Sequence, residues 1–253
     1  MLENIFLFVI IEDRIKWLTI IGWRMIEFDY IKRNFSELSE EIEKLSGSLG
    51  YRVPTLVSVT KSGTDEELLA LAAAGALDIG ENRPQEVKRR GDILRAAGFQ
   101  PRMHEIGTLQ TNKVKLIIES ASLIHSLDSE KLALEINKRA AAIGRKMPVL
   151  IEVNSGREEQ KGGIFPEKAE EFLEKLKSFE NLKLSGLMTM GPLSEEGEAL
   201  RPYFRETKKL FDRLTQYFDT DEPTLSMGMS DSYRVAIEEG STLVRVGRRL
   251  FKK

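Results

Sequence analysis

The chain of 253 residues contains no cysteine and only two histidines, His104 and His125. Without cysteine it forms neither disulfides nor thiolate metal sites, and two imidazoles leave little for a zinc site. It also lacks an excess of charge of either sign, since 38 basic and 40 acidic residues give a formal charge of -2. An even balance gives no electrostatic footprint for nucleic acid. These absences predict a metal-free, cytoplasmic protein that does not bind nucleic acid.

Short apolar runs are present instead of long ones. Eight of them, rich in Val, Ile, Leu or Met and followed by turn residues, lie near residues 53–60, 76–80, 102–107, 123–127, 147–153, 182–189, 224–229 and 243–247. Between them, segments of helical period lie near 64–74, 84–97, 110–119, 130–143, 166–178, 197–218 and 231–239. Alternating strands and helices predict a parallel sheet, and eight strands predict a single-domain α/β fold, the (β/α)8 barrel of TIM type.

One more helix is predicted before the first strand, near residues 34–49, where Phe35, Leu38, Ile42 and Leu45 recur at helical spacing. The chain stops six residues after the eighth strand. The leading helix can therefore close the barrel by filling the gap of a missing trailing helix. Two helix starts also carry caps, Thr64 with Glu67 and Ser129 before Glu130.

Residues 1–24 stand outside this pattern, and we expect residues 25–253 to form the barrel. Residues 5–11 are apolar but too short for a bilayer, which needs ~20 residues. No basic stretch precedes them and no small-residue cleavage site follows, which argues against a secretory signal. We interpret residues 1–24 as an extension, either loosely packed or a start-site artefact with Met25 as the true start; the alternative is an added helix over the barrel bottom.

Lys61 closes the first apolar run, just before Ser62 and Gly63. The carboxyl ends of the strands face the mouth where such barrels carry out their chemistry, and a lysine with a depressed pKa can form an imine with an aldehyde. An ordinary solvated lysine at a strand end is the alternative. Position alone favours that alternative.

The ends of the seventh and eighth runs have the composition of an anion site. Loops at these places in barrels commonly hold a phosphate, because backbone amides converge there. Gly228, Met229 and Ser230 follow the seventh run, and Gly247 and Arg248 end the eighth. Ser230 can donate its hydroxyl while capping the next helix, and Arg248 adds charge. A plain helix cap is the alternative role of Ser230.

Arg245 lies within the eighth run. Alternation puts it on the face opposite Val244 and Val246, so it is predicted to point into the barrel top. A guanidinium there needs a partner. The structural candidate is Glu81 or another carboxylate, and the functional candidate is a ring nitrogen of a bound cofactor.

An amine for an aldehyde, an anion site and an inward arginine together fit pyridoxal 5'-phosphate. The order and spelling of six segments make the resemblance specific: Val57-Ser58-Val59-Thr60-Lys61, Gly80-Glu81-Asn82-Arg83-Pro84-Gln85-Glu86, His104-Glu105-Ile106-Gly107-Thr108-Leu109-Gln110-Thr111-Asn112-Lys113, Gly186-Leu187-Met188-Thr189-Met190, Met227-Gly228-Met229-Ser230 and Arg245-Val246-Gly247. From about residue 26 to 251, the chain resembles the pyridoxal phosphate homeostasis proteins, single-domain relatives of the alanine racemase barrel.

The resemblance implies a role for each matching residue. Lys61 would carry the cofactor as an internal aldimine, and Asn82 would lie near the ring. Met229, Ser230, Gly247 and the amide of Arg248 would surround the phosphate, with Arg245 at the pyridine nitrogen. Arg248 replaces a frequent threonine of the family, and Phe251-Lys252-Lys253 replaces its usual Phe-Gly continuation.

The same resemblance implies a carrier that acts in vitamin B6 and amino-acid or keto-acid homeostasis, a monomer that hands its cofactor to apo-enzymes. An arginine keeps the pyridine nitrogen unprotonated, so the ring is a weak electron sink. Racemases of this type take a tyrosine from a second domain, and none of the five tyrosines here ends a predicted strand. A low-activity racemase is the alternative. An aldolase-type barrel that binds a phosphorylated carbonyl substrate is a third hypothesis, although apart from Asn82 the neighbourhood of Lys61 is short of candidates for the second acid or base it needs.

Overall fold

A closed barrel of eight parallel strands forms the centre of the molecule in the computed structural model, which describes residues 28–192 and 194–253. Neighbouring strands follow chain order, and the last pairs with the first. The strands are β1 (Thr55–Val59), β2 (Asp78–Glu81), β3 (Arg102–Glu105), β4 (Ala121–Leu127), β5 (Met147–Val153), β6 (Leu182–Thr189), β7 (Thr224–Ser226) and β8 (Leu243–Val246). The predicted (β/α)8 fold is confirmed.

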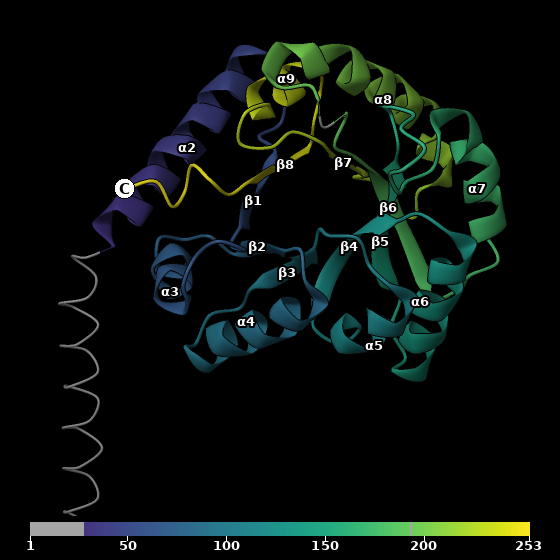
Figure 1. Ribbon diagram of the computed structural model, residues 1–253, viewed down its shortest axis with the longest axis horizontal. Coiled ribbons are helices and arrows are strands. Elements are labelled where there is room, and N and C mark those ends of the chain that lie inside the picture. Colours follow the sequence, from purple (N-terminus) through teal and green to yellow (C-terminus); the bar gives the residue numbers. More distant parts are fainter. Residues whose placement is uncertain (1–27, 193) are drawn as a thin grey trace, which may run out of the picture.

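Helices surround the barrel (Figure 1). They are α2 (Asp29–Ser48), α3 (Asp65–Ala73), α4 (Pro84–Ala96), α5 (Val114–Ile117), α6 (Glu130–Ala142), α7 (Ala169–Leu176), α8 (Arg201–Arg213) and α9 (Tyr233–Glu238). Short 3-10 turns lie at η1 (Thr111–Lys113), η2 (Pro166–Lys168), η3 (Gly197–Leu200) and η4 (Thr215–Tyr217). Three predicted helices are thus each divided into an α-helical part and one or two 3-10 turns.

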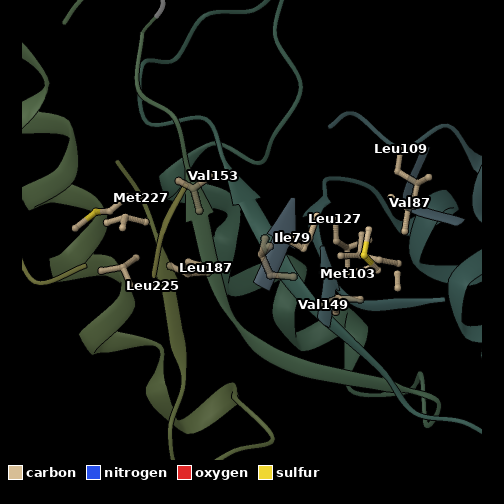
Figure 2. Close-up of a cluster of buried hydrophobic side chains, with 14 of the residues drawn as sticks. Ile79, Val87, Met103, Leu109, Leu127, Val149, Val153, Leu187, Leu225 and Met227 are labelled. Carbon is tan, nitrogen blue, oxygen red and sulfur yellow. The ribbon is translucent and has the colours of Figure 1, made fainter. Parts of the chain in front are cut away.

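The alternation of side chains along the strands separates two apolar regions. Outward residues pack under the helices in the main core, where Ile79, Met103 and Leu187 are fully buried (Figure 2). Inward residues form a smaller apolar cluster inside the barrel, made of Val57, Leu123, Leu150, Met188 and Leu243. The barrel interior also holds buried polar side chains, among them His104, His125 and Arg245.

The leading helix closes the barrel as predicted. Helix α2 packs against α3 and α9, and the C-terminal segment runs beside it (Figure 1). The Asn34 side-chain amide donates to the Leu250 carbonyl at 3.1 Å and to the Lys252 carbonyl at 2.8 Å. Farther along the helix, the Glu41 carboxylate accepts from Arg249 at 2.7 Å. The first helix therefore fixes the end of the chain against the barrel.

Two of the predicted caps are present. Thr64 and Glu67 form a reciprocal capping box at the start of α3, and the Ser129 hydroxyl accepts from the Leu132 amide at 3.4 Å. The boundary expected at residue 25 and the extension before it lie outside the described residues. Within the part of the chain that is described, no helix combines the length and the apolar character needed to cross a membrane.

Candidate functional site

Lys61 lies in the turn that follows β1. The strand ends at Val59, so Lys61 is the second residue beyond it. The prediction that Lys61 is the last residue of the strand is therefore wrong. Its side chain is exposed, and no hydrogen bond or ion pair ties it to another described residue. The amine is therefore accessible from solvent.

Arg90, a residue that the sequence analysis did not single out, holds the turn on both sides of Lys61. From α4 its guanidinium donates to the Thr60 carbonyl at 2.5 Å and to the Gly63 carbonyl at 2.7 Å. The Glu81 carboxylate lies 3.1 Å from the same guanidinium, and Arg90 is buried. In the sequence, Arg90 interrupts the apolar stripe of α4. This position could have identified it, because a charge on a buried helix face needs fixed partners.

The ends of β7 and β8 meet in a small glycine-lined cradle. The Gly247 amide donates to the Ser230 hydroxyl at 3.3 Å. The amides of Ser230 and Arg248 donate to no acceptor within the described residues. A side chain at Gly247 would place its Cβ 2.9 Å from the Val59 carbonyl, so only glycine lets β8 end this close to β1. Free amides in such a cradle suit an anion.

Ser230 does not cap a helix, although this was one of its two predicted roles. Helix α9 begins at Tyr233, so Ser230 is not its cap, and the expectation of a helix starting at Asp231 is wrong. Ser232 occupies the turn instead, and its hydroxyl accepts from the Met229 amide at 3.1 Å. Because Gly228 has a φ of 92°, the backbone turns sharply before the helix starts. The Ser230 hydroxyl is thereby directed to the end of β8.

Arg248 and Met229 both line a pocket of about 170 Å³ at the mouth, next to the loop after β6. The Arg248 guanidinium pairs with the Asp231 carboxylate, so its charge already has a partner. Asn82 is exposed after β2, which pairs with β1 on the side away from β8. A Cβ at Gly107 would lie 2.3 Å from the Asn82 carbonyl, and this close approach joins the β2 and β3 loops.

Arg245 points into the barrel, as predicted, and is buried. Its guanidinium donates to the Ser226 hydroxyl at 2.5 Å and to the Thr189 carbonyl at 3.1 Å. Glu81, which was one structural candidate for its partner, pairs with Arg90 instead. Burial lowers the pKa of Arg245 to about 10, although the Glu152 charge opposes the shift. The guanidinium thus remains charged at neutral pH.

Comparison with known proteins assigns the chain to a family. The model of the alanine racemase N-terminal domain matches residues 29–253. A pyridoxal phosphate homeostasis protein from Aquifex aeolicus is 42% identical over 218 residues, which are 85% of this chain and 95% of that protein. The chain belongs to the pyridoxal phosphate homeostasis family. A second member of this family, from Helicobacter pylori, is 35% identical over 228 residues, covering 89% of this chain and 99% of the relative.

Solved structures agree with this family. A protein of unknown function from Bifidobacterium adolescentis matches with a TM-score of 0.79 and 32% identity, over 88% of this chain and 95% of that one. PipY from Synechococcus elongatus, solved with pyridoxal phosphate bound, matches with a TM-score of 0.71 and 28% identity, over 83% and 100%. An alanine racemase from Clostridium difficile is 20% identical with a TM-score of 0.68, and it shares the fold alone.

Proposed function

We propose that this protein binds pyridoxal 5'-phosphate, holds it reversibly on Lys61, and supplies it to apo-enzymes without turning over a substrate of its own. The observation that carries the proposal is the seam between β1 and β8. There the turn with Lys61, the inward Arg245 and the cradle at Gly247 come from strands that pair directly. An amine, a cation and an anion cradle match the aldehyde, the ring nitrogen and the phosphate of one small molecule.

The residues of the cradle fit a phosphate ester. In this proposal, the free amides of Ser230 and Arg248 and the Ser230 hydroxyl hold the phosphate, and Met229 lies beside it. Arg248 contributes through its backbone, because its side chain is paired with Asp231. Hydrogen bonds to a charged group contribute about 1.5–3 kcal/mol each. The cradle therefore supplies a large part of the affinity.

Lys61 and Arg245 address the reactive part of the molecule. Lys61 would hold the cofactor through an imine with its aldehyde, formed with loss of one water and reversed by addition of one water. Arg245, which stays protonated, donates to the ring nitrogen, and Asn82 contacts the ring from the β2 side. The bound cofactor can supply an electron sink, but a ring nitrogen without its proton makes that sink weak.

The test is a comparison of Lys61→Ala with Lys115→Ala, an exposed lysine on α5. The unmodified protein and Lys115→Ala should show the visible absorbance of an imine, which hydride reduction converts to a covalent mass on Lys61. Lys61→Ala should lose both signals and keep its fold, because an exposed residue changes stability by about 0.5 kcal/mol or less. Pyridoxal without its phosphate should bind far more weakly. An imine on another lysine, or equal affinity for the two aldehydes, would refute the proposal.

A further inference from the structure

A continuous chain of polar side chains crosses the barrel interior below Arg245. The Arg245 guanidinium donates to the Ser226 hydroxyl at 2.5 Å, and the same hydroxyl lies 3.1 Å from His125 Nδ1. His125 Nε2 is 3.0 Å from His104 Nδ1, and His104 Nε2 is 3.1 Å from the Asp78 carboxylate. Five strands, β8, β7, β4, β3 and β2, supply one residue each. We call these five residues the interior chain.

Burial isolates the interior chain from water. His125 and Ser226 are completely buried, and Arg245, His104 and Asp78 retain at most 9% exposure. A polar atom in such a place must find its partner within the protein. The five residues are thus obliged to bond to one another.

The negative charge of Asp78, at the end of the interior chain opposite Arg245, sets the direction of the hydrogen bonds. Asp78 is held by Arg102, whose Nε donates at 2.6 Å, and these hydrogen bonds keep the pKa of Asp78 below its usual value although burial alone would raise it. An ionised carboxylate only accepts, so His104 donates from Nε2. With its one ring proton on Nε2, His104 accepts at Nδ1, and this requires His125 to donate from its Nε2.

The same logic continues to the guanidinium. Burial, with His104 and Arg245 nearby, keeps the pKa of His125 well below 6.5, so this imidazole is neutral. Its Nδ1 therefore accepts, and the Ser226 hydroxyl donates to it while accepting from Arg245. Every donor in the interior chain points away from Arg245 and toward Asp78. Protonation of His104 would reverse the bond to His125 and leave the Ser226 hydroxyl proton without its acceptor.

We propose that Asp78 is a remote positioning residue for Arg245, acting through His104, His125 and Ser226. The chain orients one guanidinium nitrogen, the Thr189 carbonyl takes a second, and no carboxylate bonds to the group directly. The carboxylate of the interior chain thus lies at the end opposite Arg245, and Arg245 keeps donors for a ring nitrogen. This inference rests on the proposed contact between Arg245 and the cofactor ring.

Glu152 on β5 is an ionisable group whose charge acts on Arg245. Burial and the neighbouring Asp128 raise its pKa to about 7, and no described residue donates a hydrogen bond to its carboxylate. It lies outside the interior chain. Glu152→Gln is therefore a matched control, since it changes the charge near Arg245 without interrupting the chain.

The experiment measures the two imidazoles directly in the full-length protein. With only two histidines, ¹⁵N-histidine labelling gives four ring nitrogens, which His104→Gln and His125→Gln assign. We expect both imidazoles to be neutral and protonated on Nε2 at pH 7. Asp78→Asn should mix the His104 tautomers and weaken pyridoxal phosphate binding roughly tenfold, the loss typical when an outer orienting partner is removed. Glu152→Gln should leave both tautomers unchanged.

Because Asp78 also pairs with Arg102, His104→Gln serves as the second binding variant; it interrupts the chain and preserves that pair. A doubly protonated His104, or a proton on His125 Nδ1, in the unmodified protein would overturn the proposed direction. Unchanged cofactor affinity in both variants, with Arg245→Gln binding weakly, would overturn the positioning role. The imine band on Lys61 reports the proposed function separately, since it requires no particular tautomer.

Discussion

At the scale of the residue, Glu105 shows how strongly its surroundings change a common side chain. It is completely buried on β3, directly across the strand pair from Glu81. One oxygen accepts from the Gly107 amide at 3.0 Å, and the other has no partner among the described residues. Burial, with a smaller contribution from the Glu81 charge, raises the pKa of Glu105 to about 8. The side chain is therefore mostly neutral at pH 7.

Glu105→Gln should consequently make stability less dependent on pH. A folded-state pKa raised above the unfolded value contributes stability that is present below pH 4.5 and is lost as pH rises to about 8. The glutamine variant lacks this loss, so its stability relative to the unmodified protein should rise across that window, by on the order of a few kcal/mol, and then level off. Urea unfolding at several pH values measures the difference. A constant difference from pH 5 to 9 would contradict the raised pKa.

At the scale of the element, α4 controls the turn that carries Lys61. The helix starts with Pro84 after β2. From the middle of the helix, the Arg90 guanidinium donates to the carbonyls of Thr60 and Gly63 in the turn. A carbonyl on each side of the lysine is thus fixed by one rigid element. Positioning of this kind is more accurate from a helix than from a loop.

Arg90→Met should disturb both the fold and the lysine. Removing the guanidinium leaves the buried Glu81 without its cation, and breaking a buried pair in this way costs about 3–5 kcal/mol. Imine formation should also slow, because the turn loses two hydrogen bonds. Arg89→Met, one residue away, is the control, since Arg89 is exposed and pairs with Asp65 and Glu86 at the surface. Thermal unfolding measures the loss of stability, and the growth of the imine absorbance on mixing with cofactor measures the rate. Equal stability and equal imine rates in the two variants would contradict a role of Arg90 in holding the turn.

Element prediction from the sequence succeeded where the local signal was strong. Strands such as β1 and β5 are short apolar runs, and alternation along β8 gave the inward face of Arg245 correctly. The start of α9 failed, because Ser230 and Ser232 are both suitable caps. The choice between them depends on the close packing of Gly228 against Ala236, a contact that the sequence does not reveal.

The hydrogen bonds of the interior chain could not be predicted from the sequence for a related reason. Alternation tells which face a residue occupies, but the height at which His104 meets His125 depends on the tilt of the closed sheet. The pairing of Glu81 with Arg90 could not be predicted for the same reason. Arg90 was visible as a charge on an apolar helix face, yet its carbonyl partners are set by tertiary packing.

At the scale of the whole molecule, no tyrosine among the described residues is placed to act as a second base opposite Lys61. All five tyrosines are described, and Tyr30, Tyr217 and Tyr233 are occupied by carboxylates among the helices. Tyr51 is exposed after α2, and Tyr203 lies on α8. None follows the end of a strand, where a group facing the bound cofactor would have to lie.

We therefore predict no racemisation above that of free pyridoxal phosphate. General acid or base help supplies about 100-fold to 10,000-fold per group, and a two-base reaction needs a group on each face. Alanine, serine and glutamate incubated in deuterated water should show no inversion, while transfer of cofactor to an apo-enzyme proceeds. Inversion at an enzyme-like rate that disappears in Lys61→Ala would establish a racemase instead.

The pairing of β1 with β8 also bears on how the loaded protein resists unfolding. Strands far apart in sequence must meet before this seam exists, and such non-local contacts form late and slowly. A ligand attached to the turn after β1 and anchored beyond β8 joins the seam as a crosslink would. Loading should thus leave the folding rate almost unchanged and slow the opening of the barrel, so a protein that stores a reactive aldehyde would gain lifetime against proteases while it is full.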